Sequence, residues 1–86
     1  MPEISRFYGI VIQMYTREHN PPHFHARYGS YRAQISIDSG DVSFGLLPPS
    51  AARLVKDWAA LHRQELQQNW DLLRAEQPAR SIAPLE

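Results

Sequence analysis

Two six-residue segments on either side of a Gly-Ser pair constrain the fold of this chain most. HFHARY (23–28) and YRAQIS (31–36) flank Gly29-Ser30, which predicts a two-residue tight turn between antiparallel strands. In that register one face carries Phe24, Ala26, Tyr28, Tyr31, Ala33 and Ile35. The other, the His/Arg face, carries His23, His25, Arg27, Arg32, Gln34 and Ser36. A one-residue slip would mix the two sets, so the pattern supports the register and predicts one face for a core and one for solvent or a ligand.

Other β signals lie on both sides of this hairpin. Phe7–Tyr15 is rich in β-branched and aromatic residues and apolar on both faces, which predicts one strand in the interior of a sheet. Within it, Gly9 indicates a bulge or a close approach of another backbone. Residues 16–22 predict a loop, because Asn20-Pro21-Pro22 blocks regular structure. A short strand is expected at Val42–Phe44, so the sequence predicts an antiparallel sheet of three or four strands.

From about Pro48 the apolar residues recur at helical spacing. The stripe consists of Leu54, Val55, Trp58, Leu61, Leu66, Trp70 and Leu73, and Gln77-Pro78 ends it. One helix of about 26 residues would exceed the usual length, so a kink or break is expected near residues 62–65. The order predicts an α+β fold: a small antiparallel sheet followed by one long or kinked helical segment packed on one face. We expect a single domain over residues 1–86, with a loose C-terminal tail over residues 79–86.

Composition excludes several classes of function. The chain has no cysteine, which removes disulfides, thiolate metal sites and cysteine nucleophiles and fits a reducing compartment. No run approaches the ~18 apolar residues of a membrane span, and the N-terminus lacks a signal-peptide pattern. Lys+Arg and Asp+Glu both count 9, which does not favour a strongly basic nucleic-acid binder. We therefore expect a cytoplasmic protein without a membrane partner.

Two arginines face each other on the predicted hairpin. Like charges directly opposite are unfavourable, so Arg27 and Arg32 call for a carboxylate, a phosphate or an acidic residue of a partner. An internal salt bridge is the simplest alternative, with Glu18, Asp38 and Asp41 as its candidates. Gln34 and Ser36 share this face. We therefore predict Arg27, Arg32, Gln34 and Ser36 as a binding set for an anion or a partner.

The histidines allow three interpretations. His19, His23 and His25 could form a site for zinc or another divalent transition metal, although no acid lies at an obvious short spacing and the adjacent arginines oppose a cation. Alternatively, His23 and His25 could be the acid/base pair of a metal-independent ribonuclease, with an arginine stabilising the charged phosphorane. The third interpretation, which we favour, is a binding face that performs no chemistry and needs no cofactor.

Several segments resemble a known family. ISRFYGIVIQMY, EHNPPHFHARYG, RLVKDWAALHRQEL, NWDLLRA and IAPLE together are similar to a small bacterial family, the domain of unknown function numbered 4160. The family assigns no catalytic residue. The resemblance implies a neighbouring small gene of another uncharacterised family, number 2442, in a layout like toxin–antitoxin pairs, and hence a small protein partner.

These lines of argument lead to one expectation with two alternatives. We expect a binding or toxin-like component of a two-gene module that acts through the His/Arg face. RNA or another phosphate-bearing ligand stays open as its target. The alternatives are the ribonuclease that uses His23 and His25, and the histidine-based metal-binding protein.

Overall fold

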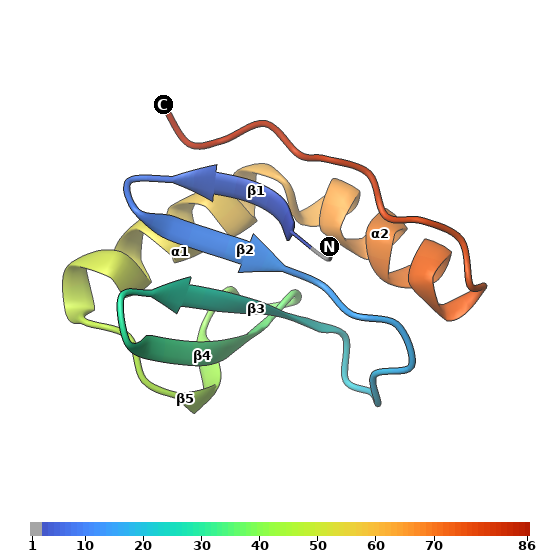
Figure 1. The fold of residues 1–86 in the computed structure, drawn as a ribbon, viewed down its shortest axis with the longest axis horizontal. Helices are drawn as coiled ribbons and strands as arrows, with labels where there is room; N and C mark the ends of the chain where they lie inside the picture. Colours follow the sequence, from blue (N-terminus) through green and yellow to red (C-terminus); the bar gives the residue numbers. More distant parts are fainter. Residues whose placement is uncertain (1–2) are drawn as a thin grey trace.

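The computed structural model describes residues 3–86 as an antiparallel sheet with two helices (Figure 1). Its elements are β1 (Glu3–Phe7), β2 (Ile10–Gln13), β3 (His23–Tyr28), β4 (Tyr31–Ser36), β5 (Val42–Gly45), α1 (Pro49–Leu61) and α2 (Arg63–Arg74). The strands lie in the sheet in chain order, and each pairs antiparallel with the next. The α+β class is confirmed, but the sheet has five strands where three or four were predicted.

The first strand was predicted incorrectly. The Phe7–Tyr15 segment is not one strand, because Tyr8 and Gly9 form the turn between β1 and β2. Both turn residues have positive φ, 51° for Tyr8 and 79° for Gly9, as a two-residue hairpin turn of the primed type requires. A tyrosine rarely adopts this conformation, so the local pattern did not indicate a turn. Gly9 therefore serves the hairpin turn and marks no bulge.

The β3–β4 hairpin has the predicted register. Tyr28 pairs with Tyr31 at the turn, Arg27 with Arg32, and His23 with Ser36 at the far end. On the apolar face four side chains are buried: Phe24, Ala26, Ala33 and Ile35. The two tyrosines beside the turn, Tyr28 and Tyr31, are exposed. The period-two pattern thus predicted which side of the hairpin contributes to the core.

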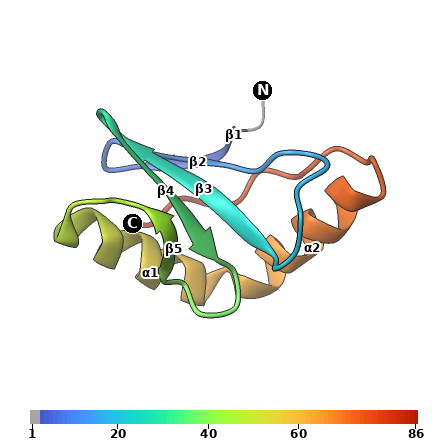
Figure 2. The same cartoon turned by 90° about the horizontal axis from the view of Figure 1, so that it is seen from below.

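α1 covers the apolar face of the sheet. Trp58 is fully buried, and its ring centroid lies 5.3 Å from that of Phe7 and 5.7 Å from that of Phe24. These contacts join the helix to β1 and β3, which are separated by β2 in the sheet. Figure 2 shows α1 beneath the sheet. Burial of large aromatic side chains is the main stabilising term at such an interface.

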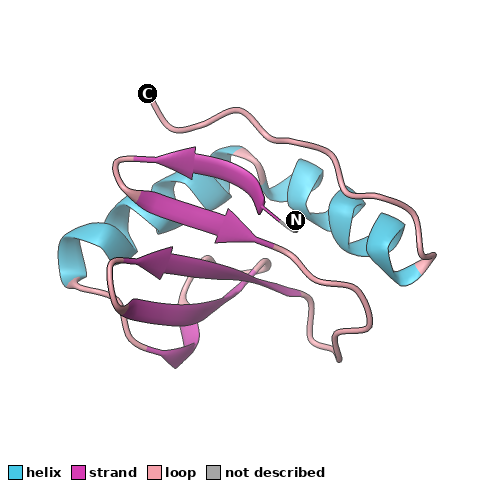
Figure 3. Ribbon diagram, in the orientation of Figure 1, coloured by secondary structure: helices cyan, strands magenta, loops and turns pink. Residues whose placement is uncertain are grey.

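The helical segment breaks at His62. This residue has φ −119° and ψ 23°, ends α1 and precedes α2, so the single predicted segment is two helices with the break where a kink was expected. The His62 N–H still donates to the Trp58 carbonyl at 3.1 Å, while the helix axis changes direction (Figure 3). The turn in direction brings α2 toward the start of β3, where the Trp70 ring centroid lies 5.2 Å from that of His23. No helix of residues 3–86 is both long and apolar enough to cross a membrane.

The C-terminal tail lacks helix and strand but is attached to the body. The sequence predicts a loose tail over residues 79–86. In the structure Ile82 is buried and donates its N–H to the Ile4 carbonyl of β1 at 2.8 Å. The Trp58 indole N–H donates to the Ala83 carbonyl at 2.8 Å. The tail thus lies along β1 at one edge of the sheet (Figure 1), while the residues of β5, at the other edge, are all exposed.

Candidate functional site

The sheet face opposite α1 carries an open pocket of about 430 Å³. The strand register places two rows of side chains across this face: Gln13, His25, Gln34 and Phe44 in one row, and Val11, Arg27 and Arg32 in the next. All of them except Val11 line the pocket, and Tyr15 lines it as well. Three of the four predicted binding residues, Arg27, Arg32 and Gln34, thus share one surface.

Ser36, the fourth predicted binding residue, does not line this pocket. Its hydroxyl oxygen accepts the N–H of Ser39 at 3.5 Å, and its backbone closes the turn that leads to β5. Gln34 reaches the pocket, while its backbone carbonyl accepts the Ser43 hydroxyl at 3.2 Å. The far end of the hairpin therefore serves the turn, and the middle of the hairpin forms the pocket.

Arg27 and Arg32 have no carboxylate within 4.0 Å among residues 3–86. The three acids that the sequence suggested as partners do not fill this role: Glu18, Asp38 and Asp41. Glu18 contacts histidines, and Asp41 pairs with Lys56 at 2.7 Å. Within residues 3–86 the internal salt bridge is therefore not formed, and neither guanidinium group of the facing strands is paired with a carboxylate.

The pKa of the Glu3 carboxyl is lowered by two arginines, Arg6 and Arg27. The Arg6 guanidinium donates two hydrogen bonds to the Glu3 carboxylate, at 2.9 and 3.1 Å, and holds the pKa of that carboxyl below its ordinary value. Desolvation acts in the opposite direction, and the charge of Arg27 adds a smaller lowering of the same pKa. The Glu3 carboxylate in turn raises the pKa of Arg6. The Glu3 carboxylate, which the charge of Arg27 also affects, is thus already paired with Arg6.

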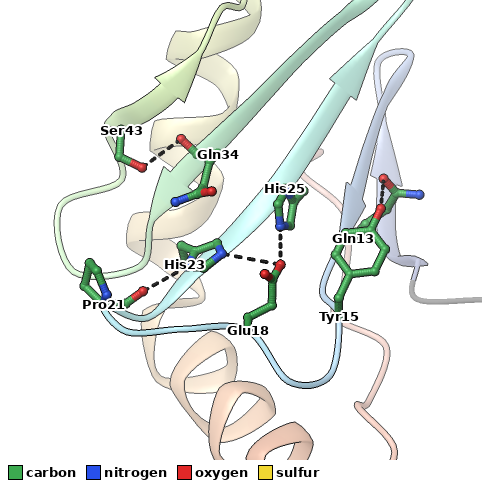
Figure 4. Close-up of polar contacts among 8 residues, drawn as sticks. All are labelled: Gln13, Tyr15, Glu18, Pro21, His23, His25, Gln34 and Ser43. Carbon is green, nitrogen blue, oxygen red and sulfur yellow. Dashed lines mark hydrogen bonds and ion pairs between the residues drawn. The ribbon is translucent and has the colours of Figure 1, made fainter.

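Glu18, His23 and His25 come together beside the pocket (Figure 4). The loop between β2 and β3 carries Glu18, whose Oε1 contacts Nε2 of His25 and lies 3.4 Å from Nε2 of His23. Nitrogen and oxygen atoms of the three side chains all lie within 4.8 Å of one another. We refer to them as the Glu18–His23–His25 cluster. Two imidazoles and a carboxylate are a set of groups that can share a proton or hold a metal ion.

His23 is buried, although its face was predicted to meet solvent or a ligand. Its ring packs on Trp70 of α2, and its Nδ1 lies 2.9 Å from the Pro21 carbonyl oxygen. The residue is 5% exposed, and its Nε2 has no hydrogen-bond partner. His25, two residues further along β3, is partly exposed and lines the pocket. Alternation along the strand predicted the shared face correctly, but the packing of α2 at its end could not be read from that pattern.

His19 is exposed and does not belong to the cluster. The sequence predicted His19, His23 and His25 as candidate metal ligands, and it offered no acidic residue at an obvious short spacing to complete the site. Glu18, the residue next to His19, takes the place given to His19. Glu18 could not be predicted because its position depends on the path of the loop through Pro21 and Pro22. This path places Glu18 against β3. The exposed Phe44 was missed for a related reason, since its position depends on the β4–β5 register.

The structure defines a small α+β protein with an open, arginine-bearing sheet face and a histidine–glutamate cluster. A family model described as "Domain of unknown function (DUF4160)" matches residues 9–71, so the chain belongs to this family, as its sequence motifs predicted. The match includes β2 to β5, α1 and most of α2, and therefore the pocket and the cluster. No curated protein and no solved structure matches the chain.

Proposed function

We propose that the protein is the binding component of a two-gene module and holds an acidic segment of a small protein partner on its open sheet face. The observation that carries the proposal is the facing pair Arg27 and Arg32, which has no counter-charge within 4.0 Å among residues 3–86. Like charges directly opposite across two strands destabilise a sheet. A carboxylate bound between them would relieve this repulsion.

The groups around the pair suit a protein partner. Arginine binds carboxylates with two parallel hydrogen bonds and is enriched, together with aromatic residues, at the energetic centres of interfaces. Phe44 lines the same pocket and is 76% exposed, and the neighbouring Leu46 is 65% exposed. Large exposed apolar side chains beside a charged pocket are typical of an interaction surface. An acidic segment with an apolar side chain would satisfy both features.

The burial of His23 favours binding over the ribonuclease alternative. An acid/base pair needs both side chains within hydrogen-bond reach of the substrate. Nε2 of His23 is buried and its Nδ1 faces the Pro21 carbonyl, so neither ring nitrogen faces the pocket. His25 alone could reach a bound phosphate. The choice of a protein from the neighbouring gene as partner, and the toxin-like role, come from the family resemblance.

Titration calorimetry tests the proposal with the product of the neighbouring family-2442 gene. We expect the wild-type protein to bind it, the double variant Arg27→Ala/Arg32→Ala to bind at least about 10-fold more weakly, and higher salt to weaken wild-type binding. Arg53→Ala is the matched control, because Arg53 is an exposed arginine on α1, outside the pocket. Equal affinity of the double variant and the wild type, or no binding by the wild type, would contradict the proposal.

A further inference from the structure

The hydrogen atom of His23 can be assigned from its neighbours. Its Nδ1 lies 2.9 Å from the Pro21 carbonyl oxygen, which can only accept a hydrogen bond. Nδ1 therefore carries the hydrogen and donates it. In the neutral ring this leaves a lone pair on Nε2, the atom that faces Glu18 (Figure 4). A backbone carbonyl that orients a histidine in this way is the usual support of a metal-binding imidazole.

Nε2 of His23 has no hydrogen-bond partner although it is buried. Its distance of 3.4 Å from Oε1 of Glu18 is well beyond the 2.7–2.9 Å that is typical of a hydrogen bond between charged groups. The Nε2 lone pair of His23 therefore has no donor, whereas Oε1 of Glu18, which it faces, is already in contact with Nε2 of His25. Buried polar groups of this kind are costly unless something satisfies them.

A metal ion would satisfy the lone pair of His23 at its present separation from Oε1 of Glu18. In a tetrahedral site with ligands about 2.0–2.1 Å from zinc, neighbouring ligand atoms lie about 3.3–3.4 Å apart. The separation of Nε2 of His23 and Oε1 of Glu18 has this value. His25 brings its own Nε2 to the same carboxylate. The Glu18 side chain is 27% exposed and belongs to a loop, so its carboxylate can rotate to make room for an ion.

From these observations we infer that the Glu18–His23–His25 cluster binds a divalent transition-metal ion of the zinc class. Two imidazole nitrogens select such ions over calcium and magnesium, which prefer oxygen ligands. The negative charge of Glu18 offsets the repulsion that the nearby arginines exert on a cation. The inference concerns a different site from the arginine pair and does not depend on the proposed partner.

Three protein ligands leave one position of a tetrahedral ion open to water or to an atom of a bound molecule. His25 belongs both to the cluster and to the lining of the pocket. The ion would therefore lie at the border of the surface that carries Arg27 and Arg32, where an acidic group of a ligand can reach it. His23 would anchor the ion from the buried side.

Titration of the untagged, metal-stripped full chain with Zn²⁺ tests the inference. We expect the wild-type protein to bind one ion, and Glu18→Gln and His25→Gln each to bind it at least about 10-fold more weakly, the smallest loss that is typical even for groups that only support a ligand. His19→Gln is the matched control, because His19 adjoins Glu18 but is exposed and outside the cluster. Glu18 and His25 are partly exposed, so their variants should fold, and circular dichroism checks this.

Co²⁺ gives a second readout that a purely structural role would not change. The wild-type protein and His19→Gln should show the visible absorption of four-coordinate cobalt, and Glu18→Gln should not. Added Zn²⁺ should also raise the melting temperature of the wild type but not that of Glu18→Gln. The inference is overturned if the wild type binds no stoichiometric ion, if Glu18→Gln binds as tightly as the wild type, or if His19→Gln loses as much affinity as His25→Gln.

Discussion

Asn69 of α2 holds Arg80 of the tail through both ends of its amide. Its Nδ2 donates to the Arg80 carbonyl and its Oδ1 accepts the Arg80 N–H, each at 2.8 Å. Asn69 is buried, with 2% of its surface exposed. The Asn69 amide makes the two hydrogen bonds that the backbone of a neighbouring strand would otherwise make to Arg80. These bonds fix the backbone of a segment that has no helix or strand of its own. The contact explains why the tail follows the body although its sequence predicts no regular structure.

The first prediction concerns this contact. Asn69→Ala removes two hydrogen bonds and leaves the Arg80 backbone groups unpaired, so the free energy of unfolding should fall by about 1–3 kcal/mol. Urea denaturation measures the change. Gln68→Ala, an exposed neighbour on the same helix, should change stability by less than about 0.5 kcal/mol. Equal stability of the two variants would show that the tail contributes nothing through Asn69.

The second prediction concerns Gly45, at the end of β5. Its φ is +87°, and an added Cβ would lie 2.4 Å from the backbone oxygen of Arg32. Gly29 also has a positive φ, +58°, but an added Cβ there meets nothing within 4 Å. Gly29→Ala should therefore cost only the conformational strain, about 1–2 kcal/mol, and Gly45→Ala should cost at least about 1 kcal/mol more.

The same two variants distinguish backbone strain at the substituted residue from displacement of the neighbouring strand. Because the clash at Gly45 is with the backbone of Arg32, relief of it must move β4 or β5, and partner binding should weaken in Gly45→Ala but not in Gly29→Ala. Thermal melts and calorimetry on the two proteins check both parts. A Gly45→Ala protein as stable as Gly29→Ala would mean that the two strands separate at little cost.

The parts of the fold that sequence predicted are those set by local periodicity. The Arg27–Arg32 register follows from side-chain alternation and a short turn, and the break at His62 lies in a helical stripe that was too long for one helix. The Tyr8–Gly9 turn was missed because a tyrosine with positive φ is held by the strands on both sides. Local residue propensity does not reflect the pairing of the two strands, which is what keeps Tyr8 in this conformation.

The candidate site was predicted as far as the hairpin determines it. His23, His25, Arg27 and Arg32 were placed on one face because alternation decides this. The burial of His23 depends on Trp70, which is far along the chain, and the position of Glu18 depends on the path of a proline-rich loop. These are tertiary relations. The sequence therefore identified the histidines but not the acid that joins them.

The third prediction concerns the pH dependence of the Glu3–Arg6 pair. The folded-state pKa of Glu3 is lowered, chiefly by Arg6, so the pair stabilises the fold fully above the ordinary glutamate pKa of about 4.3, and this contribution is lost as the pH falls through the lower folded value. In Arg6→Ala the pKa of Glu3 should rise toward its ordinary value, and Arg53→Ala should leave it unchanged. An NMR titration of the Glu3 side chain measures both. If the pKa of Glu3 in Arg6→Ala stays as low as in the wild type, a group other than Arg6 lowers it.

The fourth prediction tests the toxin-like role that the family resemblance suggests. Tightly controlled expression of the wild-type chain in a bacterial host should slow growth, and co-expression of the proposed family-2442 partner should restore it. Arg27→Ala/Arg32→Ala should lose the effect on growth if the open face carries it, provided that both proteins fold and accumulate equally. Normal growth with the wild-type protein would contradict an autonomous toxin and would leave the binding role intact.

The fifth prediction distinguishes the geometry of the arginine pair from its charge. Lysine keeps the positive charge of Arg27 but cannot form two parallel hydrogen bonds to one carboxylate. Arg27→Lys should therefore bind the partner more weakly than the wild type, by about 3- to 10-fold, yet more tightly than Arg27→Ala, and both should lose affinity as salt increases. Calorimetry at two salt concentrations measures this order. If Arg27→Lys equals the wild type, the face acts through charge alone, and if it equals Arg27→Ala, the forked contact with a carboxylate accounts for the whole contribution of Arg27.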